Sequence, residues 1–316
     1  MPSWSWIAKV TNVTEPVEFE RQYRALRHGK AFFVLAGWSS ISICGKDRQA
    51  FLHNFCTNDV KRLVPGGSCE AFITNVKGKI VGHGLIGCAD DELEFVGAPG
   101  QAAAIIAHLD RYIIREDVQL ADTTESRSYV LVLGGDKNPG ESFTSSSPIG
   151  REASIVGVNS NEVSKLVSDL AGSEFSHVQE QAFSAARIEA GFPLFGTDFD
   201  SNNLPQEIGR DREAISFTKG CYLGQETVAR IDALGHVNQR IVGLRCLGME
   251  MPRVGSELSQ GGAAVGRITS ASISPGAKGA LALAIVRREA NATGTRLDSA
   301  LGECEITELP VEAPIP

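Results

Sequence analysis

The sequence lacks the segments that mark secreted and membrane proteins. Its 316 residues contain no stretch of about 18 apolar residues, the length that a membrane-spanning helix needs. The N-terminus, Met-Pro-Ser-Trp-Ser-Trp-Ile, has no basic segment followed by an apolar run. We therefore expect neither a membrane span nor a secretory signal.

The cysteines lack the spacing of a disulfide framework or a structural zinc site. There are seven, an odd number, and no two of them form a Cys-x-x-Cys pair. Such cysteines are typical of a reducing compartment, and we expect the protein in the cytoplasm. The histidines show no His-x-x-x-His spacing, so no stable metal is expected and these histidines are interpreted as structural.

Positive charge is also scarce. The net charge is −8 and the isoelectric point is about 5.4, so there is no overall basic field and we expect no direct nucleic-acid binding. A hydrophobic fraction of 42% and a charged fraction of 22% fit a globular protein. The length exceeds that of one small core and predicts two or three domains.

Short strands grouped with helices indicate an α+β fold with antiparallel sheets rather than a doubly wound parallel one. The helices expected from apolar periodicity are Glu15–His28, Lys46–Phe55, Gly100–Ile113, Glu162–Leu170 and Gln179–Ala190. The strands expected in the first half include Cys69–Thr74, Ile80–Ile86 and Glu92–Val96. Past Gly235, short apolar segments alternate with glycines, a pattern typical of a small β-barrel.

The most unusual stretch is Lys219–Glu226, Lys-Gly-Cys-Tyr-Leu-Gly-Gln-Glu. Its glycines allow backbone conformations and close approaches that other residues resist. The ammonium of Lys219 would favour a thiolate at Cys221. The chemistry alone leaves two interpretations open, a reactive cysteine or a core cysteine in a turn.

This stretch resembles the signature of the YgfZ family, folate-binding proteins related to the T-protein (aminomethyltransferase) of the glycine cleavage system. Arg187–Asp198 and Gly266–Pro275 are similar to segments of the wider T-protein superfamily. The resemblance implies two intertwined antiparallel α+β subdomains that form a folate-binding region, followed by a C-terminal β-barrel. The expected bounds are about 1–45 and 125–235 for subdomain 1, about 46–124 for subdomain 2, and 236–316 for the barrel.

The resemblance also implies a set of folate contacts. In the T-protein family the glutamate of Arg-x-Glu-Ala-Gly holds the pterin ring, and Glu189 matches it, with Arg187 in the same motif. A carboxylate suits an aminopyrimidinone edge because it accepts two adjacent N–H bonds. Glu207, in a match to the family's Leu-Pro-x-Glu, is expected to order the loop below the pocket. Arg230 is expected to meet an anionic folate tail or Glu226.

One part of the T-protein pattern is missing. T-proteins carry an Asp-Asp pair on the strand that follows an Asn-x-x-Gly-x-Ile turn, and one of these aspartates is essential for aminomethyl transfer. The matching turn begins at Asn75, and Gly82 and His83 stand where the aspartates belong. Ala98 stands where the family has an asparagine that touches the pterin. His83 could accept a proton or be structural.

The resemblance implies a YgfZ-like accessory protein that binds tetrahydrofolate or a derivative. It would serve the assembly or maintenance of iron–sulfur enzymes, including those that modify tRNA, and its partners would be these proteins or their assembly factors. Cys221 would be the working residue, in a loop formed with Lys219, Gly220, Tyr222, Gly224, Gln225 and Glu226. One cysteine cannot hold a cluster, so a transient ligand, a role in resolving a damaged cluster and a mixed disulfide all remain open.

Two enzymatic alternatives remain. A folate-dependent aminomethyltransferase of the glycine cleavage type is disfavoured by Gly82 and His83. A demethylase or sarcosine-oxidase-like domain shares the fold, but those enzymes carry a flavin domain, and no Gly-x-Gly-x-x-Gly motif opens a helix in this sequence.

Overall fold

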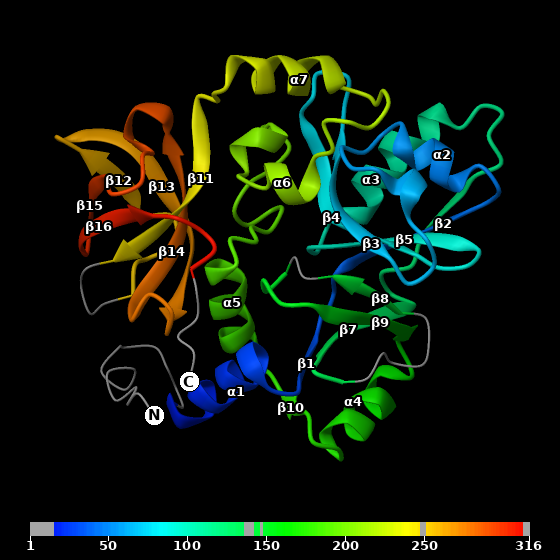
Figure 1. Cartoon of the computed structure of the whole chain (residues 1–316), viewed down its shortest axis with the longest axis horizontal. Coiled ribbons are helices and arrows are strands. Elements are labelled where there is room, and N and C mark those ends of the chain that lie inside the picture. The colour runs from blue at the N-terminus through cyan, green and yellow to red at the C-terminus, as the bar shows by residue number, and fades with distance from the viewer. Residues whose placement is uncertain (1–15, 136–141, 146–147, 247–250, 312–316) are drawn as a thin grey trace.

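The computed structural model describes residues 16–135, 142–145, 148–246 and 251–311. These residues form two open five-stranded sheets and one closed barrel. Figure 1 shows the barrel beside the two sheets, with α7 lying across the top between the barrel and the second sheet. The predicted α+β fold with a C-terminal β-barrel is confirmed.

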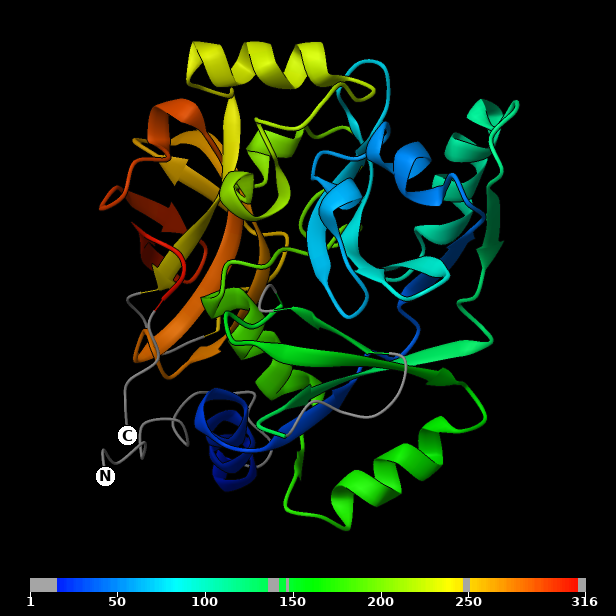
Figure 2. The same cartoon turned by 45° about the vertical axis from the view of Figure 1, so that its right-hand side comes forward.

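The first sheet has the strand order β10-β1-β7-β9-β8. Its strands are β1 (Ala31–Val34), β7 (Arg127–Leu133), β8 (Ser142–Ser145), β9 (Ala153–Asn159) and β10 (Ser176–His177). All neighbours are antiparallel except β1 and β10. Successive side chains of a strand point to opposite faces, so Phe33 packs with α1 (Pro16–His28) and α5 (Glu180–Glu189), and Phe32 packs towards α4 (Val163–Ala171). Figure 2 shows α4 below this sheet.

The second sheet has the order β3-β4-β5-β2-β6. Its elements are β2 (Ser39–Cys44), α2 (Arg48–His53), η2 (Val60–Arg62), β3 (Ser68–Thr74), β4 (Ile80–Cys88), β5 (Glu92–Gly97), α3 (Ala102–Leu109), η3 (Asp110–Tyr112) and β6 (Gln119–Asp122). The chain leaves the first sheet after β1, builds the second, and returns at β7. Strand β2 pairs with β5 and β6 and so lies in the second sheet, although the sequence analysis placed residues up to about 45 with the first.

The barrel closes in the order β11-β14-β13-β12-β15-β16. Its elements are β11 (Gln239–Cys246), β12 (Glu257–Gln260), β13 (Ala263–Ser274), β14 (Gly279–Arg287), η5 (Arg288–Ala290), β15 (Arg296–Ser299) and β16 (Gly302–Thr307). Strand β14 is apolar on both faces because alternate residues serve two cores. Ala282 and Ala284 fill the barrel, and Leu281 and Leu283 pack against the segment after α5.

The segment between α5 and the barrel is mostly irregular. It contains η4 (Pro205–Glu207), α6 (Asp211–Ala214) and α7 (Gln225–Leu234). Helix α7 was not expected from the sequence, because Val228 is its one buried residue and its apolar stripe is correspondingly weak. The predicted helix at Glu15–His28 corresponds to α1, and Glu15 lies outside the described residues.

Candidate functional site

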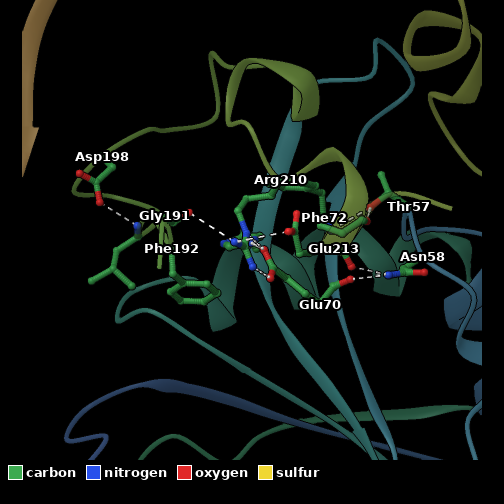
Figure 3. Close-up of polar contacts among 12 residues, drawn as sticks. Thr57, Asn58, Glu70, Phe72, Gly191, Phe192, Asp198, Arg210 and Glu213 are labelled. Atoms are coloured by element: carbon green, nitrogen blue, oxygen red, sulfur yellow. Dashed lines mark hydrogen bonds and ion pairs between the residues drawn. The ribbon is translucent and has the colours of Figure 1, made fainter. Parts of the chain in front are cut away.

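A buried cluster of charged side chains lies where the second sheet meets the segment after α5. Glu70 on β3 accepts hydrogen bonds from Arg210, at 3.0 Å from Nε to Oε1 and 2.6 Å from Nη2 to Oε2. His83 on β4 places Nε2 2.8 Å from Glu70 Oε1. Figure 3 shows Glu70 and Arg210 facing each other beside Phe192. A carboxylate only accepts, so His83 Nε2 carries the proton.

Opposing effects set the charge of this cluster. Burial alone would raise the pKa of Glu70, but the Arg210 charge and the hydrogen bonds from His83 and Arg210 outweigh it and lower the pKa to about 2. Burial would lower the pKa of Arg210, but the Glu70 carboxylate holds it above its ordinary value. The pair is therefore ionised at neutral pH.

Gly82 and His83 stand where T-proteins carry the acidic pair, and both positions are closely packed. The His83 ring is enclosed by aromatic rings whose centroids lie 4.7 Å (Phe72), 5.5 Å (Phe192) and 5.5 Å (Phe199) away. A Cβ on Gly82 would stand 2.4 Å from Ile105 Cδ1. An aspartate at position 82 would require Ile105 to move, and the carboxylate of this region comes instead from Glu70 on the neighbouring strand.

The Glu189 side chain is fully buried and already holds four hydrogen bonds. Its Oε2 accepts from the Tyr23 hydroxyl at 2.6 Å and forms an ion pair with Arg27. Its Oε1 accepts from Ser274 Oγ at 2.5 Å and from the Gly276 amide at 3.0 Å. These donors tie α1 and the barrel to α5. In this arrangement Glu189 does not fit a pterin, because each carboxylate oxygen already accepts two bonds.

Arg187, on the same helix, is equally engaged. Its Nη1 lies 3.2 Å from Asp198 Oδ2, and its Nη2 donates to Ser270 Oγ at 2.8 Å. Asp198 Oδ1 accepts in turn from Thr269 Oγ1 at 2.6 Å. These buried bonds hold α5 against β13, so Arg187 has a structural role in this arrangement.

The other two expected folate contacts lie apart from α5. Glu207 is buried, and its Oε2 accepts from Asn203 Nδ2 at 2.7 Å, from the Leu204 amide at 3.3 Å and from Gln239 Nε2 at 3.3 Å. Glu207 thus orders its own loop and joins it to the start of β11. Arg230 is exposed on α7.

Lys219 occupies a buried position in the Cys221 loop, and its ammonium is committed elsewhere. Its Nζ donates to the backbone carbonyl oxygens of His53 at 2.6 Å, Cys56 at 2.6 Å and Asn58 at 2.9 Å. An ammonium has three donors, so all of them are used. Burial lowers the pKa of Lys219. The expectation that this ammonium favours the Cys221 thiolate is therefore wrong, and its contacts instead fix the loop to the protein.

The remaining motif residues explain how the loop is held. The Tyr222 ring is buried under the Lys219 ammonium, with Nζ 4.9 Å from the ring centroid. Gly224 has φ 85°, and a Cβ there would stand 2.4 Å from the carbonyl oxygen of Asn75. Only glycine fits this contact with the β3–β4 turn. Gln225 and Glu226 begin α7, where a carboxylate is favoured by the helix dipole.

Cys221 itself is exposed, as is Gly220 before it. The interpretation of Cys221 as a core residue is excluded. Across the described ranges, no three His, Cys, Asp or Glu side chains gather in a group that could hold a metal ion. Within the same ranges, none of the helices combines the length and the apolar character that crossing a membrane requires.

Comparisons with known proteins show what the fold and the sequence are similar to. The family of the glycine cleavage T-protein C-terminal barrel domain matches residues 239–314. The structure of the glycine cleavage system aminomethyltransferase T from Bartonella henselae superposes with a TM-score of 0.81 over 95% of this chain and 91% of that one, at 19% identity. This likeness shows the fold.

Sequence relatives extend over most of the chain. An aminomethyltransferase of Nostoc sp. is 23% identical, over 90% of this chain and 84% of its own length. A tRNA-modifying protein YgfZ of Hamiltonella defensa is 29% identical, over 71% of this chain and 73% of its own. Over most of its length the chain is thus similar both to aminomethyltransferases and to proteins named YgfZ, and its C-terminal part matches the T-protein barrel family.

Proposed function

We propose that this chain is a YgfZ-like accessory protein for the assembly or maintenance of iron–sulfur enzymes and that it works through Cys221. The observation that carries the proposal is the exposure of this thiol in a loop whose neighbours are fixed from inside. A loop held by Lys219, Tyr222 and Gly224 presents one reactive group at a constant place. The similarity to proteins named as tRNA-modifying supports enzymes of tRNA modification as clients. We expect it to work in the cytoplasm, where the thiol stays reduced.

Folate is the proposed ligand, as tetrahydrofolate or a derivative, and the support is the similarity to aminomethyltransferases. Binding at Glu189 would require at least one of its present donors to turn away. This requires buried groups to move, since Tyr23 and Ser274 are both fully buried and the Gly276 amide is part of the backbone. The pterin would then replace hydroxyl donors by its own N–H groups.

The aminomethyltransferase activity is the second candidate. One observation favours it, the carboxylate of Glu70 at hydrogen-bond distance from His83, where the family has its acidic pair. The same carboxylate is neutralised by Arg210 and fully buried, which opposes a role in proton transfer. Release of ammonia from an aminomethylated lipoyl carrier in the presence of tetrahydrofolate would establish this activity.

The accessory function is tested in cells that lack the protein. Iron–sulfur enzyme activity and the modification of tRNA are measured after expression of the wild type, Cys221→Ser or Cys44→Ser, whose thiol is half-buried on β2. We expect the wild type and Cys44→Ser to restore both and Cys221→Ser to restore neither. Full restoration by Cys221→Ser would refute the proposal.

Folate binding is tested by titrating the purified protein with tetrahydrofolate in a calorimeter. We expect saturable binding by the wild type, at least tenfold weaker binding by Glu189→Gln, and unchanged binding by Glu213→Gln, whose side chain is 43% exposed. A tenfold change corresponds to about 1.4 kcal/mol, the scale of one lost charged hydrogen bond. Absence of saturable binding by the wild type would remove folate from the proposed function.

A further inference from the structure

His53, at the end of α2, lies beside the Cys221 loop. The side chain is buried, with 5% of its surface exposed. A Cβ placed on Gly220 would have one neighbour within 4 Å, His53 Nε2 at 3.8 Å. Gly220 is exposed and directly precedes Cys221. The Nε2 edge of the imidazole is therefore turned towards the turn that carries the thiol.

The other ring nitrogen of His53 faces a carboxylate. Nδ1 lies 3.3 Å from Asp59 Oδ1. Both atoms are buried, and neither makes a hydrogen bond within the described residues, so the two face each other at contact distance without another polar partner. Asp59 Oδ2 lies 3.1 Å from Arg62 Nε, which leaves Oδ1 for the imidazole. A proton on Nδ1 would face Asp59 and leave the Nε2 lone pair directed at the loop.

The loop, the histidine and the aspartate are fixed to one another through the backbone. The Lys219 ammonium binds the carbonyl oxygen of His53 and also that of Asn58, the residue before Asp59. The Leu223 amide donates to the Asn54 carbonyl at 2.8 Å. Residues on both sides of Cys221 are thus bonded to residues next to His53 and Asp59.

The charges around His53 keep its ring neutral. Burial lowers the pKa of His53, the nearby Lys219 lowers it further, Lys61 adds to this, and Asp59 opposes them. A neutral imidazole has one nitrogen free to accept a proton, which a general base needs.

We propose that His53 is the general base for Cys221 and that Asp59 orients the His53 ring, forming a Cys–His–Asp constellation for thiol–disulfide exchange. Three groups in this order, a nucleophile, a base and an orienting acceptor, are the usual means of activating a weak nucleophile. The co-reactant is a disulfide, either a low-molecular-weight one or one within a client protein. The inference deepens the proposed function, since it concerns the same Cys221.

The step balances without a further oxidant. The S–H bond of Cys221 breaks and its proton moves to His53 Nε2. The thiolate attacks one sulfur of the disulfide, a new S–S bond forms to Cys221, and the original S–S bond breaks. The second sulfur leaves as a thiolate and takes the proton from His53. Cys221 is oxidised and the leaving sulfur is reduced.

The test is the pH profile of Cys221 alkylation in the purified full chain. Iodoacetamide is applied from about pH 6 to about pH 9, a range that brackets the pKa of a free thiol. The alkylated Cys221 peptide is quantified by mass spectrometry. We expect the rate of His53→Gln at pH 7 to fall at least about tenfold, because the variant has no base to take the thiol proton and a positioned general base contributes about 100-fold or more. The alkylation rate of Asp59→Asn should fall by less. In both variants the rate of mixed-disulfide formation with oxidised glutathione should fall in parallel.

The matched control is His108→Gln, which alters a buried histidine on α3 whose ring bonds the Thr74 carbonyl. Its profile should equal that of the wild type. The proposal is overturned if Cys221 in folded His53→Gln is alkylated with the same pH profile as in the wild type. Should His53→Gln fail to fold, an unchanged profile in Asp59→Asn overturns it equally, because that side chain is partly exposed and its loss is better tolerated. The assay contains no folate and no client, so its failure would leave the cellular result with Cys221→Ser unaffected.

Discussion

Replacing Glu70 by glutamine tests the central charged cluster most directly. The pKa of this carboxyl is lowered from 4.5 to about 2 in the folded protein. A depression of about 2.5 units corresponds to about 3 kcal/mol of stabilisation at pH 7. Removal of one partner of a buried ion pair costs a similar amount, about 3–5 kcal/mol, because the other charge stays buried without compensation. We expect Glu70→Gln to lower the free energy of unfolding by about 3 kcal/mol at pH 7.

The sign of the pH dependence follows from the direction of the shift. A carboxyl with a depressed pKa contributes stability above its unfolded pKa of about 4.5, and the contribution is lost as the pH falls towards about 2. The difference between the wild type and Glu70→Gln should therefore narrow on acidification, by roughly 1 kcal/mol at pH 4. Urea denaturation at the two pH values measures both quantities.

Glu213→Gln is the matched control, because Glu213 also faces Arg210, at 4.0 Å, but its side chain is 43% exposed. An exposed pair contributes less than about 1 kcal/mol, so this variant should unfold close to the wild type. If Glu70→Gln and Glu213→Gln lose the same free energy of unfolding, or if the difference at pH 7 persists unchanged at pH 4, the argument from burial and charge is refuted.

Two further substitutions test how the Cys221 loop is held, each by urea denaturation. Gly224→Ala should lower the free energy of unfolding by at least about 2 kcal/mol, because it adds a clash with Asn75 to the strain of a positive φ. The control Gly235→Ala, at φ 70° with open space around it, should lower it by about 1 kcal/mol. Equal losses in the two variants would contradict the clash. Lys219→Met should lose about 2 kcal/mol because three carbonyls lose their donor. The exposed Lys46→Met should be neutral, and similar stabilities of the two lysine variants would count against this role.

The fold was largely predictable because its strands and helices carry local patterns. The hairpin of β3 and β4 and the glycine-punctuated barrel are visible in short windows of sequence. Helix α7 was not predicted because Val228 is its one fully buried residue, so its sequence has little apolar periodicity. The assignment of β2 to the second sheet depends on its pairing with β5, which lies about fifty residues further along the chain and has no local signal.

The site was predictable only where one short motif defined it. The sequence identified Cys221 but gave the wrong environment for Lys219, because the carbonyls that bind its ammonium lie more than 160 residues away. Glu70 was not singled out, since its partner Arg210 is 140 residues distant. His53 was interpreted as structural because it shows no metal-ligand spacing, and its neighbours Asp59 and Gly220 in the fold are not its neighbours in a sequence motif. For the charged cluster, the available signal was Glu70, a carboxylate inside the apolar strand Cys69–Thr74.

Helix α7 has a consequence for how chains of this kind can change in length. Its ten residues, Gln225–Leu234, lie between Gly224, which is pressed against the β3–β4 turn, and Gly235, which leads into β11. A helix advances about 1.5 Å and turns about 100° for each residue. One inserted or deleted residue would therefore rotate the barrel's entry point relative to the cysteine loop, whereas a surface loop would absorb it. Related chains that keep both parts should hold this interval at ten residues while their loops vary freely.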